Sequence, residues 1–238
     1  LEYGAQEATG QLALTAGQVQ KRYDLDDRAA ARDLDTTTAA LGLRVKVMPK
    51  TKLLVDVEHE IGSYSNGVTA STSDYNENRA YLGLSWEGTA SSTGKVRAGA
   101  SKRELESGRT ISKPAWDVGV IWSPLEYTRF TLDGSQRTTD GTLPTTAIES
   151  TSATLGWGYD VNDRVETRLS YTFTNDTHQR VALSERKDDS TAISASVNYQ
   201  MRRWMVLGAG MTMRDRNSNV AGFDFKRNVF ALNALISL

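Results

Sequence analysis

The sequence has no cysteine, only four prolines and only two histidines in 238 residues. The absence of cysteine excludes disulfide bridges, thiolate metal sites and a cysteine nucleophile. The two histidines, His59 and His178, do not have the spacing of a paired metal ligand, so we expect neither a metal nor another cofactor. The 28 Lys and Arg residues nearly balance the 29 Asp and Glu residues, so we expect no nucleic-acid partner.

Long hydrophobic runs are also missing. The longest unbroken apolar run extends from Trp204 to Met211, far short of the roughly 20 residues that a membrane-spanning helix needs. This excludes a helical membrane protein but leaves a membrane β-barrel open. The chain begins at Leu1 without a signal-like segment, so we expect a processed or trimmed chain.

What is present instead is alternation of apolar and polar residues with a period of two. About twelve stretches of roughly ten residues show it, each bounded by polar or turn-forming segments. In the clearest stretch, residues 204–214, the apolar positions are Met205, Leu207, Ala209, Met211 and Met213. The pattern predicts antiparallel strands with one oily face, in a single domain that covers residues 1–238.

The connections between these stretches alternate in length. Short turns are expected at 48–52, 123–127, 160–164 and 200–203. Long polar segments are expected at 24–35, 62–76, 103–112, 136–148, 175–189 and 215–222. This arrangement is typical of outer-membrane barrels with short periplasmic turns and long extracellular loops. An even number of strands would place both termini in the periplasm.

Alternation alone also fits a soluble sandwich or barrel with the apolar face inside. Two observations favour lipid outside. The polar face is rich in Gly, Ser, Thr and charged residues, as a wet lumen would be. Aromatic residues also mark the ends of the oily faces. Near the short turns these are Trp86, Trp122, Trp157, Tyr159 and Tyr199, and near the long loops they are Trp116, Phe173 and Phe230.

We therefore predict an all-β transmembrane antiparallel barrel of about twelve strands, closed so that every backbone group is paired in lipid. Its expected location is the outer membrane of a Gram-negative bacterium, in contact with membrane lipid and lipopolysaccharide. The charged residues expected to face the lumen are Arg44, Lys46, Asp56, Glu58, Glu60, Lys95, Arg97, Asp117, Arg129, Asp133, Glu166, Arg168 and Arg214.

These charges have two interpretations. They could form a mildly anion-attracting surface that hydrogen-bonds the hydroxyls and carboxylates of sugars. They could instead form ion pairs between strands that fill and stiffen a narrow barrel. Two aromatic residues on the polar face, Tyr81 and Trp204, could stack on sugar rings or serve only in packing.

Short motifs in a fixed order carry a resemblance to a family. They comprise Trp86 with Thr93 and Gly94, Trp122-Ser123-Pro124 with Thr128, Tyr199 with Arg203 and Trp204, and Arg214 with Ser218, Asn219, Arg227 and Asn228. With them, the sequence resembles the outer-membrane β-barrel porins of exopolysaccharide operons, the EpsL-type family. The apolar C-terminal positions from Phe230 to Leu238 also resemble the assembly signal of bacterial outer-membrane barrels.

The resemblance implies a channel or scaffold in polysaccharide export, with a polysaccharide chain and periplasmic export proteins as partners. Two alternatives remain open. One is a general diffusion porin, and the other is a closed barrel that anchors or binds through loops such as 24–35 and 175–189. We do not expect an enzyme, because His59 is predicted to face lipid and His178 to lie in a loop, which leaves no Ser/His or Asp/His constellation.

Overall fold

The structure is a computed structural model that describes residues 1–5, 8–24, 33–65, 74–89, 91–106, 108–140, 145–180 and 183–237. These residues form 13 strands and no helix, so none of the described segments is a helix able to span a membrane. The strands are β1 (Glu2–Tyr3), β2 (Gly10–Lys21), β3 (Leu34–Met48), β4 (Thr51–Tyr64), β5 (Tyr75–Thr89), β6 (Ser92–Leu105), β7 (Thr110–Leu125), β8 (Thr128–Asp140), β9 (Thr145–Asn162), β10 (Val165–Arg180), β11 (Arg186–Arg202), β12 (Met205–Ser218) and β13 (Phe225–Ile236).

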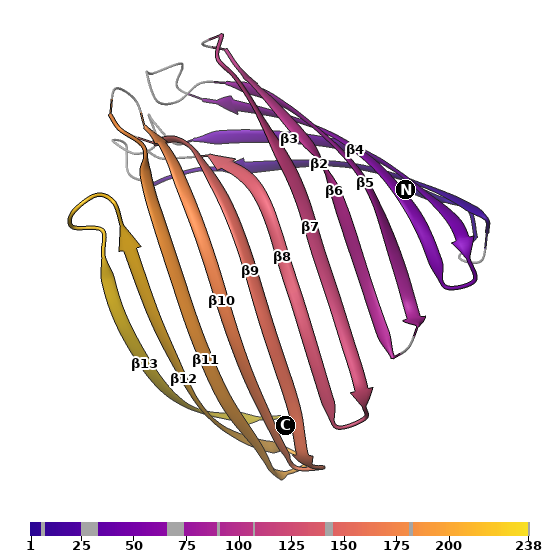
Figure 1. Cartoon of the computed structure of the whole chain (residues 1–238), viewed down its shortest axis with the longest axis vertical. Helices are drawn as coiled ribbons and strands as arrows, with labels where there is room; N and C mark the ends of the chain where they lie inside the picture. The colour runs from indigo at the N-terminus through magenta and orange to yellow at the C-terminus, as the bar shows by residue number, and fades with distance from the viewer. Residues whose placement is uncertain are drawn as a thin grey trace.

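All 13 strands belong to one sheet in which each strand pairs with its neighbour in sequence. The sheet is strongly curved, with the short turns gathered along one end and the longer connections along the other (Figure 1). Every pairing is antiparallel, as in a chain of hairpins. The predicted antiparallel all-β architecture is therefore confirmed, with one more strand than the approximate count from the sequence.

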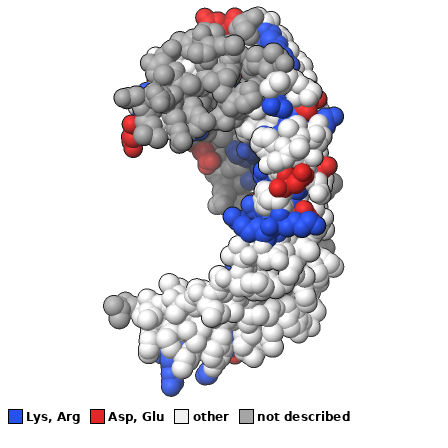
Figure 2. All heavy atoms as spheres, turned by 90° about the vertical axis from the view of Figure 1, so that its left-hand side faces the viewer, with Lys and Arg blue, Asp and Glu red and all other residues white. Residues whose placement is uncertain are grey.

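The expected closure is not seen, because the sheet curls into a C-shaped trough (Figure 2). Among the described strands, β13 pairs only with β12. On the side of β2 away from β3, the backbone pairing in the described part of the chain is short: Leu1 exchanges hydrogen bonds with Leu14, Glu2 lies opposite Ala13 and Tyr3 opposite Leu12. Alternation fixes which face each residue occupies, but it does not specify which edges meet.

The strands also extend further toward the long connections than the sequence predicted. The segments expected as loops at 103–112 and 175–189 are largely strand, since β6 ends at Leu105, β7 begins at Thr110, β10 ends at Arg180 and β11 begins at Arg186. Polar side chains pair across these extensions. Asn175 Nδ2 donates to Asp189 Oδ1 at 2.6 Å. Paired polar residues thus extend the hairpins beyond the apolar band.

The register divides the side chains cleanly between the two faces. The apolar sets of neighbouring strands lie opposite one another, as in the row Leu14, Leu41, Val57, Ala80, Ala100. Most of these apolar side chains are exposed, for example Leu41 at 45% and Leu82 at 59%. Charged side chains on the other face contact residues two strands away. Arg97 of β6, for example, contacts Asp56 of β4. The polar face is therefore the concave one, and the oily face is convex.

Candidate functional site: the concave face

The concave face is divided into two regions of different chemistry. On β4–β7 it carries a dense set of ion pairs, which we call the ion-pair wall: Asp56, Glu58, Glu60, Glu77, Arg79, Lys95, Arg97, Arg103 and Asp117. On β8–β12 it carries mainly glycine, serine and threonine. Strand alternation places both sets inward, because every second residue of each strand shares one face.

Arg97 and Asp117 form the part of the ion-pair wall nearer the short turns. Arg97 donates from Nε to Asp117 Oδ2 at 2.8 Å and from Nη1 to Asp56 Oδ2 at 2.8 Å. Lys95 Nζ lies 3.3 Å from Asp117 Oδ1. The Arg97 guanidinium also lies 4.7 Å from the centre of the Tyr81 ring, which is buried. Tyr81 therefore serves in packing here, while Trp204 is exposed in the turn between β11 and β12.

Glu77 and Arg103 are the most deeply buried part of the wall. The Glu77 side chain is 0% exposed and that of Arg103 is 2% exposed. Arg103 donates to Glu77 Oε2 from Nε at 2.8 Å and from Nη2 at 2.6 Å, and it lies over the Tyr75 ring at 4.0 Å. Arg79 joins Glu77 to Glu58 and Glu60 at 2.8 to 3.2 Å. This network fills the space in front of the sheet there.

Glu77, Arg79 and Arg103 are not among the charges predicted from the sequence to face the lumen. Glu77 and Arg79 share the inward alternation of Tyr81, so the period-two pattern could have found them. Arg103 falls in the segment 103–112, which the sequence predicts to be a loop, but it lies in β6, opposite Glu77 and Ile111. His178 was also expected in a loop. It lies in β10 opposite Arg186, with its Nε2 3.3 Å from Asp188 Oδ2.

On β8–β13 the concave face forms what we call the hydroxyl groove. Two cross-strand rows make its floor: Thr131, Gly156, Ser170, Ser194 and Thr212, followed by Arg129, Gly158, Arg168, Ser196 and Gly210. A cavity of about 640 Å³ lies over these residues. That volume falls within the range of small-molecule sites.

The glycines of the groove differ in how tightly they pack. A Cβ on Gly156 would lie 2.3 Å from Thr131 Oγ1. A Cβ on Gly158 would meet nothing closer than 3.9 Å, so the space above Gly158 is open. Arg129 and Arg168 flank Gly158 in the same row, and Arg168 Nη2 lies 2.6 Å from Glu166 Oε1. The groove is thus a small-residue passage with arginines at its side.

One further cross-strand row runs around the whole concave face, and we call it the cationic row. It is made of Lys46, Lys52, Ser85, Lys95, Gly119, Asp133, Thr154, Thr172, Ala192, Arg214 and Arg227. The adjacent row holds Arg44 opposite Leu54 and Gln11. The register therefore places all the predicted lumen-facing charges on the concave side, but in separate groups.

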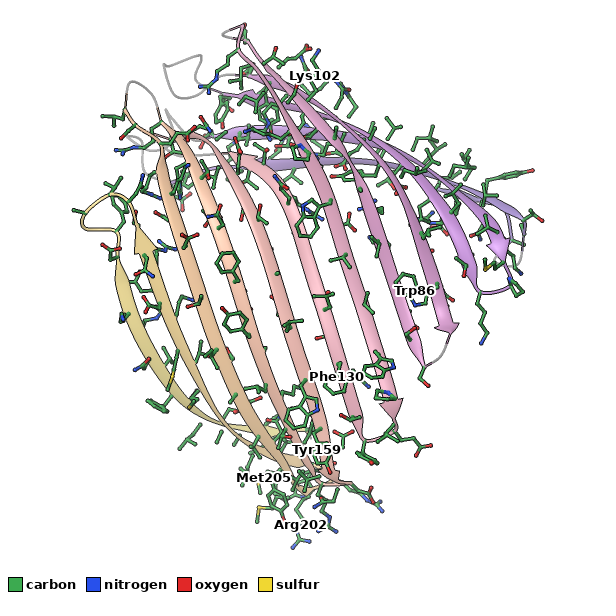
Figure 3. The ribbon with its side chains drawn as sticks, in the orientation of Figure 1. Trp86, Lys102, Phe130, Tyr159, Arg202 and Met205 are labelled. Carbon is green, nitrogen blue, oxygen red and sulfur yellow. The ribbon has the colours of Figure 1, made fainter. Side chains whose placement is uncertain are left out.

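The aromatic residues predicted near the short turns lie on the convex side of the strand ends. Trp122 stacks on Phe130 with ring centres 5.4 Å apart, and Tyr159 contacts Tyr127 at 5.6 Å and Trp157 at 5.8 Å. Trp86, Phe130 and Tyr159 all lie toward the short-turn end of the sheet (Figure 3). The predicted set also includes Tyr199, three residues before the end of β11.

The aromatic residues expected near the long loops have a different position. Trp116, Phe173 and Phe230 lie near the middle of β7, β10 and β13. This difference arises because the strands continue well past the expected loop boundaries. His59 is on the convex face as predicted, where its Nδ1 lies 2.8 Å from Asn78 Oδ1. In the part of the chain that the structure describes, no cluster of His, Asp or Glu could hold a metal ion.

Solved structures with a similar fold are outer-membrane proteins. The siderophore receptor PirA from Pseudomonas aeruginosa aligns with a TM-score of 0.59 at 13% identity, over 96% of this chain and 42% of its own. The FrpB iron transporter from Neisseria meningitidis aligns at 0.52 and 12%, over 88% of this chain and 40% of its own. The outer-membrane channel DcaP of Acinetobacter baumannii aligns at 0.53 and 11%, over 99% of both chains.

The chain thus spans only about two fifths of the length of the PirA and FrpB structures that it resembles. At these identities the likeness establishes the fold, which is that of outer-membrane β-barrels. No curated protein matches the sequence. A family described as "Putative beta-barrel porin 2" matches residues 2–237, which is nearly the whole chain. The chain therefore belongs to this beta-barrel porin family.

Proposed function

We propose that the protein is an outer-membrane channel through which a polysaccharide passes along the hydroxyl groove during export. The observation that carries the proposal is the floor of Gly, Ser and Thr on β8–β12, which leaves a cavity of about 640 Å³ beside a wall of paired charges. Hydroxyl groups can donate and accept hydrogen bonds, so such a floor offers a sliding sugar chain many equivalent weak contacts.

Two similarities support the channel part of the proposal: membership in a beta-barrel porin family, and a fold shared with DcaP, which is an outer-membrane channel. The export part rests on the resemblance to barrels of exopolysaccharide operons. In this proposal the short turns, the start of β2 and the end of β13 face the periplasm, where export proteins would deliver the polysaccharide. The two-residue β1, which makes the strand number odd, turns back from that side along β2. The long connections face outward and contact lipopolysaccharide.

The test is single-channel conductance of the refolded chain in a planar lipid bilayer. Neutral and acidic oligosaccharides are added on the side of the short turns. We expect steady conductance that is interrupted by sugar. Steady conductance without interruption by any sugar would favour a general diffusion porin instead.

A glycine substitution makes the test specific for the groove. The open space above Gly158 accepts a side chain without backbone strain, so Gly158→Phe would fill the groove. We expect it to lower the conductance and the sugar block, while the barrel still inserts. Gly10→Phe is the matched control, because Gly10 lies opposite Val45 on the convex side and its Cβ would meet nothing within 4 Å.

The ion-pair wall favours a second candidate, a barrel whose narrow interior makes it an anchor or a surface-binding module. Such a protein would insert into the bilayer but conduct no current. Deletion of a long connection would then abolish surface binding, whereas in a channel it would spare the conductance. Most of the 24–35 segment lies outside the described residues, so 183–185 together with its flanking hairpin ends is the more defined choice for deletion.

A further inference from the structure

Two arginines face each other at the end of the cationic row. Arg214 of β12 lies directly opposite Arg227 of β13, on the concave side, and both are exposed. Like charges directly opposite in a sheet repel each other. Within the described part of the chain, no ion pair to a carboxylate involves either residue.

The nearby carboxylates are already used elsewhere. Asp215, next to Arg214 in sequence, lies on the convex side, where its Oδ2 is 3.0 Å from Lys226 Nζ. Asp224 accepts a hydrogen bond from the Ser218 backbone N–H at 2.7 Å. The positions across β11 and β10 in the same row are Ala192 and Thr172, which carry no charge. The protein thus presents two adjacent cations without supplying their counter-charge.

A third arginine is fixed beside this pair. The Arg216 guanidinium lies 4.9 Å from the centre of the Phe225 ring, and its Nε donates to Ser190 Oγ at 3.3 Å. A guanidinium held in this way loses little freedom when it binds an anion. Figure 2 shows Lys and Arg side chains gathered at mid-height on the trough, above a region with few charges.

Hydroxyl pairs connect these arginines to the groove. Ser194 Oγ and Thr212 Oγ1 are 3.1 Å apart, and Thr154 Oγ1 and Thr172 Oγ1 are 3.0 Å apart. Thr212 lies two residues before Arg214 on the same strand and face, and it also borders the cavity of the groove. A ligand in the groove would therefore touch hydroxyls along its length and reach the arginines at one side.

From this arrangement we infer that Arg214, Arg216 and Arg227 form a binding site for the carboxylate groups of an acidic saccharide. The guanidinium fork matches a carboxylate with two parallel hydrogen bonds. The neighbouring serine and threonine hydroxyls bind the uncharged hydroxyls of the same sugar. The inference rests on the proposed passage of polysaccharide along the groove and names the chemical class of that polysaccharide.

The test measures binding rather than conductance, by isothermal titration of the refolded chain in detergent micelles with trigalacturonate. We expect binding that weakens as salt is added, because it is electrostatic. Arg214→Gln with Arg227→Gln should weaken it by about tenfold or more, since hydrogen bonds to charged groups carry this much affinity. Maltotriose, a neutral trisaccharide, should bind more weakly and equally to both proteins.

Two further variants separate the site from general effects of charge and folding. Arg202→Gln with Arg203→Gln removes the same charge from the exposed end of β11 and the turn that follows it, and should leave trigalacturonate binding unchanged. Arg214→Lys with Arg227→Lys keeps the charge but not the fork, so it should bind with intermediate affinity. Heat-dependent migration in gels verifies that each variant is folded.

Four results would overturn the inference: no binding of trigalacturonate, equal affinity for trigalacturonate and maltotriose, unchanged binding by the Arg214→Gln, Arg227→Gln variant, or tighter binding of inorganic phosphate than of trigalacturonate. The last would mean an anion site without preference for sugar. A chain that is silent in bilayers yet binds trigalacturonate would refute the channel but not this site. A conducting chain that binds no acidic sugar would refute only the site.

Discussion

At the scale of single residues, the ion-pair wall contains buried charges, and removal of any one of them lowers the stability of the protein. Glu77 and Arg103 are both almost fully buried and bonded to each other through two nitrogens. A buried ion pair is costly to break, because the remaining partner keeps its charge without compensation. The exposed pair of Lys102 and Glu104, on the neighbouring alternate positions of β6, is 2.6 Å apart but half exposed.

The contrast gives a matched prediction. Glu77→Gln should lower the free energy of unfolding by about 3 to 5 kcal/mol, measured by urea titration of the barrel in lipid vesicles. Glu104→Gln should change it by no more than about 0.5 kcal/mol, because exposed pairs contribute little. Equal effects of the two substitutions would contradict the assignment of Glu77 to a packed interior.

A second prediction concerns close approach of the backbone. A Cβ on Gly99 would lie 1.8 Å from the carbonyl oxygen of Ala80, so Gly99→Ala must displace β5 from β6. We expect a loss of about 1 to 3 kcal/mol in the same urea titration. Gly119→Ala is the control, because its Cβ would meet only Asp133 Oδ1 at an ordinary 3.6 Å. Wild-type stability of Gly99→Ala would show that β5 and β6 are further apart than described.

The sequence predicts which face a charged residue occupies, but not which other charged residues it contacts. Alternation assigned Arg97, Asp117 and Asp56 to one face, and the structure brings these three into contact. It could not tell that Arg129 and Arg214 would belong to different groups. Contact between side chains depends on the stagger of neighbouring strands, and a period of two carries no information about stagger.

At the scale of strands, the alternation predicted most strand centres but not their ends. β10 and β11 continue through Asn175 and Asp189 because polar side chains pair across the hairpin where no apolar pattern remains. The longer strands also change the position of the aromatic residues along them. Trp116 and Trp122 share β7 and its convex face, and they are six residues apart, which is about 20 Å along a strand.

That separation yields a prediction about depth in the membrane. A tilted strand crosses an apolar band about 25 Å tall, so a tryptophan that far from the interface lies well inside it. In variants that keep only Trp116 or only Trp122, we expect lipids brominated deep in the acyl chain to quench Trp116 more strongly. Lipids brominated near the headgroup should quench Trp122 more strongly. The reverse order would place Trp116 in an aromatic belt near the long loops.

At the scale of the whole molecule, the free edges of the sheet govern how it can sit in a bilayer. Lipid offers no partner to an unpaired backbone group, so an inserted sheet must have its edges paired. β2 and β13 each contain 12 residues and run in opposite directions, and both present apolar side chains on the convex side. These features fit an antiparallel pairing of β2 with β13 after insertion, in which β13 takes the place beside β2 that Leu1 and β1 occupy here.

A cross-linking experiment tests this pairing. Because the sequence has no cysteine, only the introduced thiols can react. We expect a short bifunctional maleimide to link Leu14→Cys with Leu232→Cys within one chain after insertion into vesicles. The single variant Leu14→Cys controls for links between chains. A product of twice the chain mass from the double variant would mean that a second copy, rather than β2 of the same chain, covers β13.

The order of charges along β3 and β4 has an electrical consequence. Arg44, Lys46 and Lys52 lie toward the short turns, whereas Asp56, Glu58 and Glu60 follow one another toward the long connections. Arg97 and Arg79 pair with these carboxylates, so the β3–β4 side of the passage is more positive near the short turns than near the long connections. This polarity acts on mobile ions according to the sign of the applied voltage. Such a passage should rectify, so the asymmetry of its current–voltage curve would report which way round the protein has inserted.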